Sequence, residues 1–222
     1  AIRNANDAIS LSQTAEGALG KVADNLQRMR ELAVQAANGT NSTADRTTLD
    51  QEYTALAGEV TRVLESTKFN GLSLLNSAVP AGGFDFQVGA NNNANEKINI
   101  AVSDITAGAG IAAVTSGGAS ASIADATGAL ALGAMDALST AIDEVSTARA
   151  KFGASQNRFE AVIANLQIAS ENQSASRSRI MDADFASETA NLTRGQILQQ
   201  AGTAMLAQAN SLPNGVMALL RG

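Results

Sequence analysis

The tightest cluster of side chains that could do chemistry is acidic: Asp182, Asp184 and Glu188 lie within seven residues of one another. Their carboxylate oxygens could bind a divalent ion, but a calcium loop also needs a glycine at a position where this segment has none. Acidic residues at the start of a helix more often cap the helix and complement its dipole. We therefore expect helix caps here and no metal site.

Other catalytic chemistry is limited by the composition. The 222 residues include no Cys, no His and no Trp. The chain therefore has no thiol nucleophile, no thiolate ligand, no disulfide and no histidine general base. The glycines between Gly108 and Gly118 do not follow the strand-to-helix pattern of a phosphate-binding loop. The sequence predicts no catalytic residue, no cofactor-binding residue and no metal ligand, so we expect a protein that is not an enzyme and needs no cofactor.

Charge and hydropathy narrow the possible partners. The formal net charge is −6 and the isoelectric point is about 4.7, which disfavours a nucleic-acid-binding surface. No apolar stretch reaches the roughly 18 to 20 residues of a membrane span, and no secretory signal peptide is visible at the start. The helical pattern is already under way at Ile2, so we expect the chain to begin inside a helix.

Long helices must position the functional side chains, because apolar and small residues repeat every three and four positions up to Ala36. This heptad spacing is typical of helices that pack as coiled coils. We expect Asn38-Gly39 to end the first helix in a left-handed cap. The predicted buried stripe consists of Ala1, Ala5, Ala8, Ser12, Ala15, Leu19, Val22, Leu26, Met29, Ala33 and Ala36.

Two more stripes predict two further helices. Thr43 or Asp45 is expected to cap the second helix, and Phe69-Asn70-Gly71 to end it. In the third, which starts near Met135, Arg149 and Gln156 occupy two stripe positions, where polar residues usually fix register and partner choice. The apolar positions are Leu49, Tyr53, Leu56, Val60 and Val63 in the second helix, and Leu138, Ile142, Val145, Phe152, Phe159, Ile163 and Leu166 in the third.

The period changes between the second and third helices. Residues 84–88 and 98–102 alternate apolar and polar side chains, which predicts two strands joined by a turn-rich segment. Residues 103–128 are rich in Ala, Gly, Ser and Thr, which predicts either a small irregular lobe or a mobile loop. The expected fold class is mainly α: a long antiparallel, coiled-coil-like helical rod with a small β-hairpin region and a short variable insert.

The last helix differs from the others because Arg194 is the only charged residue between Thr189 and Leu220. Its apolar residues are spread around the helix, and we expect Leu212-Pro213-Asn214-Gly215 to break it. The core helix of a bundle could have this composition. Because no helix of matching length remains in the chain as its partner, the sequence favours assembly with another chain.

Six motifs occur in a fixed order: residues 3–19 (RNANDAISLSQTAEGAL), 25–35 (NLQRMRELAVQ), 69–72 (FNGL), 86–91 (FQVGAN), 208–213 (QANSLP) and 219–221 (LLR). Together they resemble bacterial flagellin, over most of the chain except residues 103–128. The resemblance implies that the family's outermost N-terminal helix would precede Ala1. The alternative is another coiled-coil assembly protein, such as a component of a secretion needle or tip or of a phage tail.

The resemblance implies a structural subunit that is secreted by type III export and polymerises through coiled-coil helices into the extracellular flagellar filament, for swimming motility. The implied partners are further copies of the subunit, a flagellin export chaperone, the filament cap and hook–filament junction proteins, and the host Toll-like receptor 5. Four segments are implied: 1–102 as the N-terminal part of the rod domain, 103–130 as the variable insert, 131–175 as the C-terminal rod helix, and 176–222 as the terminal helix of the filament core.

Two sets of site residues also follow from the resemblance. The family's receptor-contact motif matches Gln27, Arg28, Leu32 and Glu52. Arg28 and Leu32 are spaced i and i+4 and lie off the predicted stripe, so we expect both on one exposed face; Arg28 and Glu52 could instead form only an interhelical ion pair. Assembly and chaperone binding, the latter in a helix-in-groove mode, are expected at Leu192, Ile197, Leu198, Met205, Leu206 and Leu212.

Overall fold

The computed structural model describes the backbone of residues 1–115, 117–182 and 184–222, and the side chains of these residues apart from 211–221. The chain forms two compact units, unit 1 (Ala1–Ile168) and unit 2 (Ala169–Gly222). Long helices dominate, and the described strands form two small antiparallel sheets. The prediction of a mainly α chain with small β-hairpins is confirmed.

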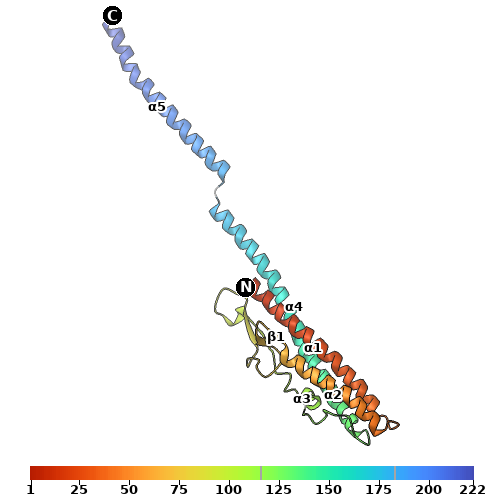
Figure 1. Ribbon diagram of the computed structural model, residues 1–222. Helices are drawn as coiled ribbons and strands as arrows, with labels where there is room; N and C mark the ends of the chain where they lie inside the picture. The colour runs from red at the N-terminus through yellow and green to blue at the C-terminus, as the bar shows by residue number, and fades with distance from the viewer. Residues whose placement is uncertain (116, 183) are drawn as a thin grey trace. The chain divides into compact units, whose positions relative to one another are not determined.

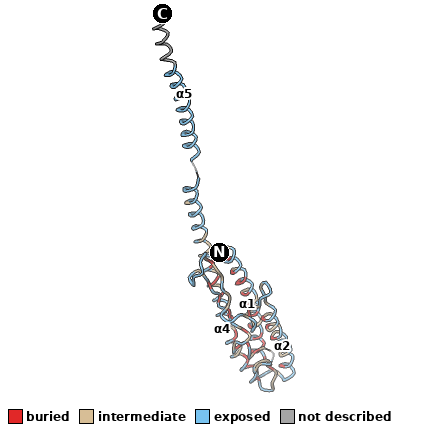
Figure 2. The backbone as a smooth tube through the Cα atoms, turned by 90° about the vertical axis from the view of Figure 1, so that its left-hand side faces the viewer, coloured by how far each residue is buried: buried red, intermediate tan, exposed pale blue. Residues whose placement is uncertain are grey.

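Unit 1 is built on a pair of antiparallel helices, α1 (Ile2–Ala36) and α2 (Thr43–Ser66), joined by a short turn. The first part of α4 (Ala129–Met181) lies beside them (Figure 1). In α1 every predicted stripe position from Ala5 to Ala36 is buried, whereas Ala1 is exposed. Figure 2 shows buried residues in red along α1, α2 and the first part of α4. The heptad spacing therefore predicted the buried face of α1.

The stripe of α2 is displaced from the predicted one. Tyr53 and Val60 are buried as expected, but Leu49, Leu56 and Val63 are only half-buried. The other buried positions are Arg46, Ala57 and Leu64. The buried face is displaced because α2 contacts the 103–128 segment as well as α1. In α4, Leu138, Val145, Phe152 and Phe159 are buried as predicted.

The helix ends differ from the predictions. Ser42 is the N-cap of α2 and forms a reciprocal capping box with Asp45, because each side chain accepts a hydrogen bond from the other's backbone N–H. α1 ends at Ala37 in a right-handed conformation, not in a left-handed cap at Asn38-Gly39. The Gln35 carbonyl accepts hydrogen bonds there from the backbone N–H of Asn38 (3.2 Å) and from Nδ2 of Asn41 (2.7 Å). A right-handed turn supported by a side-chain donor thus ends the helix.

Two hairpins follow α2, which ends at Ser66. β1 (Lys68–Phe69) pairs with β2 (Leu72–Ser73), so Phe69-Asn70-Gly71 belongs to a hairpin and does not end a helix. Asn70 (φ 50°) and Gly71 (φ 80°) both adopt the left-handed conformation that two-residue hairpin turns require. β3 (Phe84–Gln87) pairs with β4 (Lys97–Ile100), as the alternation predicted, and the short 3-10 helix η1 (Ala94–Glu96) lies in the loop that connects them.

The 103–128 segment is an irregular lobe that packs into the core of unit 1. It contains one short helix, α3 (Ala109–Val114). Four of its apolar side chains, Ile105, Ile111, Val114 and Ile123, are buried. Of the two alternatives left by the composition, the described residues match the small lobe.

Unit 2 contains the end of α4 and the helix α5 (Phe185–Arg221). The predicted boundary between residues 175 and 176 falls inside α4. The predicted break at residues 212–215 is wrong, because α5 continues through them. A proline cannot donate one backbone hydrogen bond of a helix, and the 37 residues of α5 include Pro213. Within the described part of the chain, none of the helices has the length and hydropathy of a membrane span.

Candidate functional site

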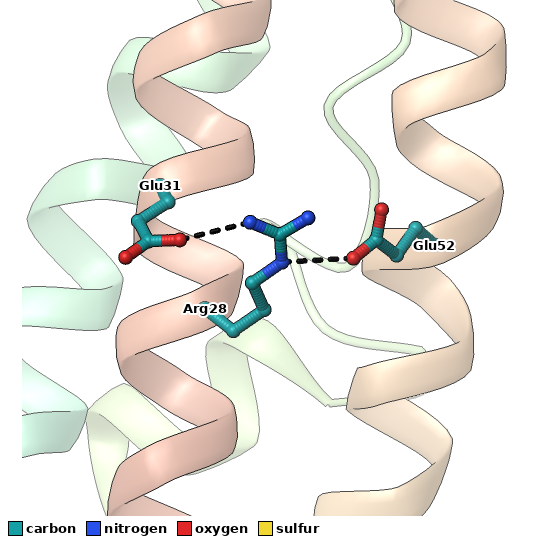
Figure 3. A network of polar contacts seen from close by, with 3 residues as sticks. All are labelled: Arg28, Glu31 and Glu52. Carbon is teal, nitrogen blue, oxygen red and sulfur yellow. Dashed lines mark hydrogen bonds and ion pairs between the residues drawn. The ribbon is translucent and has the colours of Figure 1, made fainter.

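Arg28 lies at the centre of a polar network that joins α1 to α2 (Figure 3). Its Nε atom donates to Oε1 of Glu52 on α2 (2.8 Å), and its Nη1 atom donates to Oε2 of Glu31 on α1 (2.9 Å). The antiparallel pairing of the two helices brings residues 28 and 52 face to face. The ion pair that the sequence offered as an alternative therefore forms, and it fixes the direction in which the guanidinium points.

The network is on the surface, with about half of the Arg28 and Glu52 side chains exposed. The hydrogen bond to Glu52, and after it the bond to Glu31, raises the pKa of Arg28 above its usual value. Because the pair is solvated, we expect it to orient the side chains more than it stabilises the fold. A planar guanidinium with its direction fixed is suited to bind carboxylate or carbonyl oxygens.

Only some of the predicted receptor-contact residues share this surface. Gln27, Arg28 and Glu52 are exposed, whereas Leu32 is 1% exposed and belongs to the core. The prediction that Leu32 shares an exposed face with Arg28 is therefore wrong. Leu32 directly precedes the buried Ala33, and the buried face of α1 is wide enough here to include both.

A second polar site, which the sequence analysis did not identify, holds the lobe in place. Arg46 is 2% exposed and donates hydrogen bonds to four main-chain oxygens. Its Nε and Nη2 atoms reach the carbonyls of Ala36 (2.8 Å) and Asn38 (3.1 Å) at the end of α1. Its Nη1 atom reaches those of Asp125 (3.3 Å) and Ala126 (2.8 Å) in the lobe. A cation here also complements the negative end of the α1 dipole.

Two more residues on the same face of α2 contact the lobe. The Tyr53 hydroxyl donates to the carbonyl of Ser120 (2.8 Å), and Oδ1 of Asp50 accepts from the backbone N–H of Ile123 (2.7 Å). Burial, together with the charge of Asp50, raises the pKa of Tyr53 well above its usual range. Positions 46, 50 and 53 are spaced i, i+4 and i+7, so one helical face forms hydrogen bonds with main-chain atoms of residues 120–126. We call Arg46, Asp50 and Tyr53 the lobe anchor.

The two polar stripe positions of α4 meet one carboxylate of α1. Gln156 donates to Oε2 of Glu16 (2.9 Å), and Nη2 of Arg149 lies 3.7 Å from Oε1 of the same residue. These contacts join α4 to α1 at one level of the helix pair, as expected of polar residues that fix register.

Unit 2 presents the predicted assembly residues to solvent. Leu192, Ile197, Leu198, Met205 and Leu206 are between 58% and 70% exposed. The side chain of Leu212 lies outside the described residues. The sequence has no charged residue from Gly195 to Leu220. Contiguous apolar surface of this kind is typical of interaction sites.

The acidic cluster acts as a helix cap. Oδ1 of Asp184 accepts from the backbone N–H groups of Ala186 (3.0 Å) and Ser187 (3.3 Å), at the start of α5. Among the residues with described side chains, no group of three Asp, Glu, His or Cys is arranged to hold a metal ion.

Comparison with known proteins identifies the family to which this chain belongs. Two family models match: the bacterial flagellin N-terminal helical region over residues 1–79, and the bacterial flagellin C-terminal helical region over residues 135–220. A flagellin from Halalkalibacterium halodurans is 44% identical over 221 residues, which cover 100% of this chain and 78% of the relative. This chain belongs to the bacterial flagellin family.

Other flagellins are also similar to it. A Bacillus subtilis flagellin is 41% identical over 248 residues, covering 100% of this chain and 80% of the relative. The crystal structure of Bacillus cereus flagellin matches with a TM-score of 0.63 at 32% identity, covering 79% of this chain and 95% of that one. As a member of the flagellin family, the protein is a structural subunit of the extracellular flagellar filament and not an enzyme.

Proposed function

We propose that this flagellin polymerises through α5, whose exposed apolar side chains pack against helices of neighbouring subunits in the filament. The observation that supports this most directly is the exposure of Leu192, Ile197, Leu198, Met205 and Leu206 on a helix almost without charge. Each Å² of apolar surface that association removes from water contributes about 25 cal/mol of favourable free energy. Since a filament subunit has many copies of itself as partners, the same helix in another copy is the natural occupant.

The test measures polymerisation of the intact subunit on sheared filament seeds, followed by sedimentation. We expect Leu198→Asn and Leu206→Asn to lower the polymerised fraction at least about tenfold, because each would bury an unpaired amide. Val34→Asn, at an exposed valine of α1 in unit 1, is the matched control and should polymerise normally. Normal polymerisation of both α5 variants would contradict the proposal.

The same helix is the expected site for the export chaperone during secretion by the type III route. A nearly uncharged helix with exposed apolar side chains suits a partner groove that receives side chains at i, i+3, i+4 and i+7. Titration of the cognate chaperone by calorimetry should give weaker binding to Leu198→Asn and unchanged binding to Val34→Asn. Undiminished binding would limit α5 to subunit packing. The filament cap and the hook–filament junction proteins remain expected partners of the same subunit.

Recognition by host Toll-like receptor 5 is the second candidate function, and its supporting observation lies in unit 1. The guanidinium of Arg28 is held at the surface between two carboxylates, beside the exposed Gln27. We assign the contact to Gln27, Arg28 and Glu52, and give Leu32 a packing role because it is buried. Arginine with its fork fixed in this way often contributes strongly to binding once it is desolvated.

A receptor reporter assay tests this surface. Arg28→Ala should lower signalling by about tenfold or more, which corresponds to the loss of one strong interface contact. Arg62→Ala is the matched control, because Arg62 is also exposed and also bonded to a glutamate three residues away, Glu59. Circular dichroism should show that both variants are folded. Equal signalling by both variants would reject the assignment.

A further inference from the structure

Two methionines of unit 2 are equally open to solvent. Met181 and Met205 are each 70% exposed, whereas Met29 in the core of unit 1 is fully buried. The chain has no cysteine, so its thioethers are its only sulfur groups. Because oxidation of a thioether requires access to the sulfur, these two are the expected first targets of an oxidant among the methionines whose side chains the structure describes.

The two sites differ in what surrounds them along the chain. Met181 has Arg177 and Arg179 before it and Asp182 and Asp184 after it, so its surroundings remain hydrated. Met205 lies in the stretch without charges, seven residues after Leu198 and directly before Leu206. On a helix, residues seven apart lie on the same face, so Met205 extends the apolar surface that Leu198 begins.

We infer that Met205 is an oxidation-sensitive site that controls whether the subunit can join the filament. The oxidant is a peroxide. The sulfur lone pair attacks one peroxide oxygen, an S–O bond forms and the O–O bond breaks. The thioether is oxidised by two electrons to the sulfoxide, and hydrogen peroxide is reduced to water.

The effect on assembly follows from the change in polarity. A sulfoxide is a strong hydrogen-bond acceptor, and burying it among apolar side chains without a donor is unfavourable. The inference rests on the proposed role of α5, because packing of α5 against another copy would bury Met205 in the filament. Oxidation at Met181, between charged residues, leaves a group that water can still solvate. The two positions therefore form a matched pair within one chain.

The experiment treats intact subunits with hydrogen peroxide and measures sulfoxide at each methionine by peptide mass spectrometry. Each sample is then polymerised on filament seeds. We expect sulfoxide at Met181 and Met205 well before Met29, and at least a tenfold loss of polymerised protein from the parent. Met205→Leu should keep its polymerisation after peroxide, and Met181→Leu should lose it as the parent does.

A second pair of variants needs no oxidant. Met205→Gln places a polar group of similar length at the site and should polymerise poorly, whereas Met181→Gln should polymerise normally. Peroxide sensitivity of Met205→Leu equal to that of the parent would overturn the inference, as would normal polymerisation of Met205→Gln. If Leu198→Asn and Leu206→Asn fail to polymerise while the oxidised parent succeeds, the assembly role of α5 stands and only the oxidation switch is rejected.

Discussion

The Nη1 atom of Arg46 donates a hydrogen bond to the main-chain oxygen of Ala126, 80 residues further along the chain (2.8 Å). The same guanidinium closes the end of α1 through the carbonyl of Ala36. One side chain therefore joins the turn between α1 and α2 to the lobe directly before α4. All four of its acceptors are main-chain oxygens, so its removal takes one hydrogen-bond donor from each of four carbonyls, among them that of the buried residue Ala36.

Arg46→Met should therefore lower the free energy of unfolding by about 3 kcal/mol, since the apolar volume is kept but the four hydrogen bonds of a buried guanidinium are lost. Arg62→Met, on the exposed face of the same helix, should leave stability unchanged within error. Denaturant unfolding of both variants, followed by far-ultraviolet circular dichroism, measures the difference. Equal stability of the two variants would show that Arg46 does not hold the lobe.

Tyr53 gives an alkaline test of the lobe anchor, because it is the only tyrosine in a chain without tryptophan. Burial raises its pKa above the ordinary value of 10.0, so the unfolded chain loses the phenol proton first and stability falls as the pH rises past about 10. Absorbance at 295 nm should show ionisation only together with unfolding. Tyr53→Phe should lower the free energy of unfolding by about 1 kcal/mol and abolish this absorbance change. Ionisation of a folded parent near pH 10 would contradict the burial of the hydroxyl.

Asp125 gives an acid test at the start of α4. The hydrogen bond from the Thr127 hydroxyl is the largest cause that lowers the pKa of Asp125 to about 2, and the backbone N–H groups of Ala129, Thr127 and Gly128 add to it. The resulting stability is complete above the unfolded value of 3.8 and is lost as the pH falls toward about 2. Asp125→Asn should be less stable than the parent at pH 7, with the difference closing over this range. Thr127→Val should raise the Asp125 pKa, measured by carbon NMR of the carboxyl group.

Two glycines with similar left-handed backbones should respond differently to alanine. A Cβ atom at Gly71 (φ 80°) would meet nothing within 4 Å, so Gly71→Ala should cost only the backbone strain, about 1 kcal/mol. A Cβ atom at Gly83 (φ 83°) would lie 2.0 Å from the Ile100 carbonyl oxygen, so Gly83→Ala must also displace β4 and should cost at least about 2 kcal/mol. Thermal unfolding compares them. Equal melting temperatures would mean that the β3–β4 hairpin accommodates the added methyl group without a loss of stability.

The sequence was informative where the cause of a structure lies within one element. The stripe of α1 from Ala5 to Ala36 follows directly from the heptad spacing, and the alternation at residues 84–88 and 98–102 predicted β3 and β4 to within two residues at each end. The family could be identified because its six motifs occur in a fixed order along the chain.

The remaining features depend on distant segments. Leu32 lies one residue before the stripe position Ala33, and the width of a buried face is set by every element that contacts it. The role of Arg46 depends on the carbonyls of residues 125 and 126. Because every residue carries a main-chain carbonyl, the sequence does not indicate which of them will accept a hydrogen bond. A weak signal was present, because Arg46 lies seven residues before the stripe position Tyr53 and so extends that stripe toward the start of α2.

The lobe anchor binds the main chain of residues 120–126 and none of its side chains. Replacing Ser120 or Ala126 by another residue would leave every one of these bonds available, since all residues except proline carry the same backbone groups. Exposed residues of the lobe, such as Ala126, can therefore change in sequence while these main-chain bonds to α2 are kept.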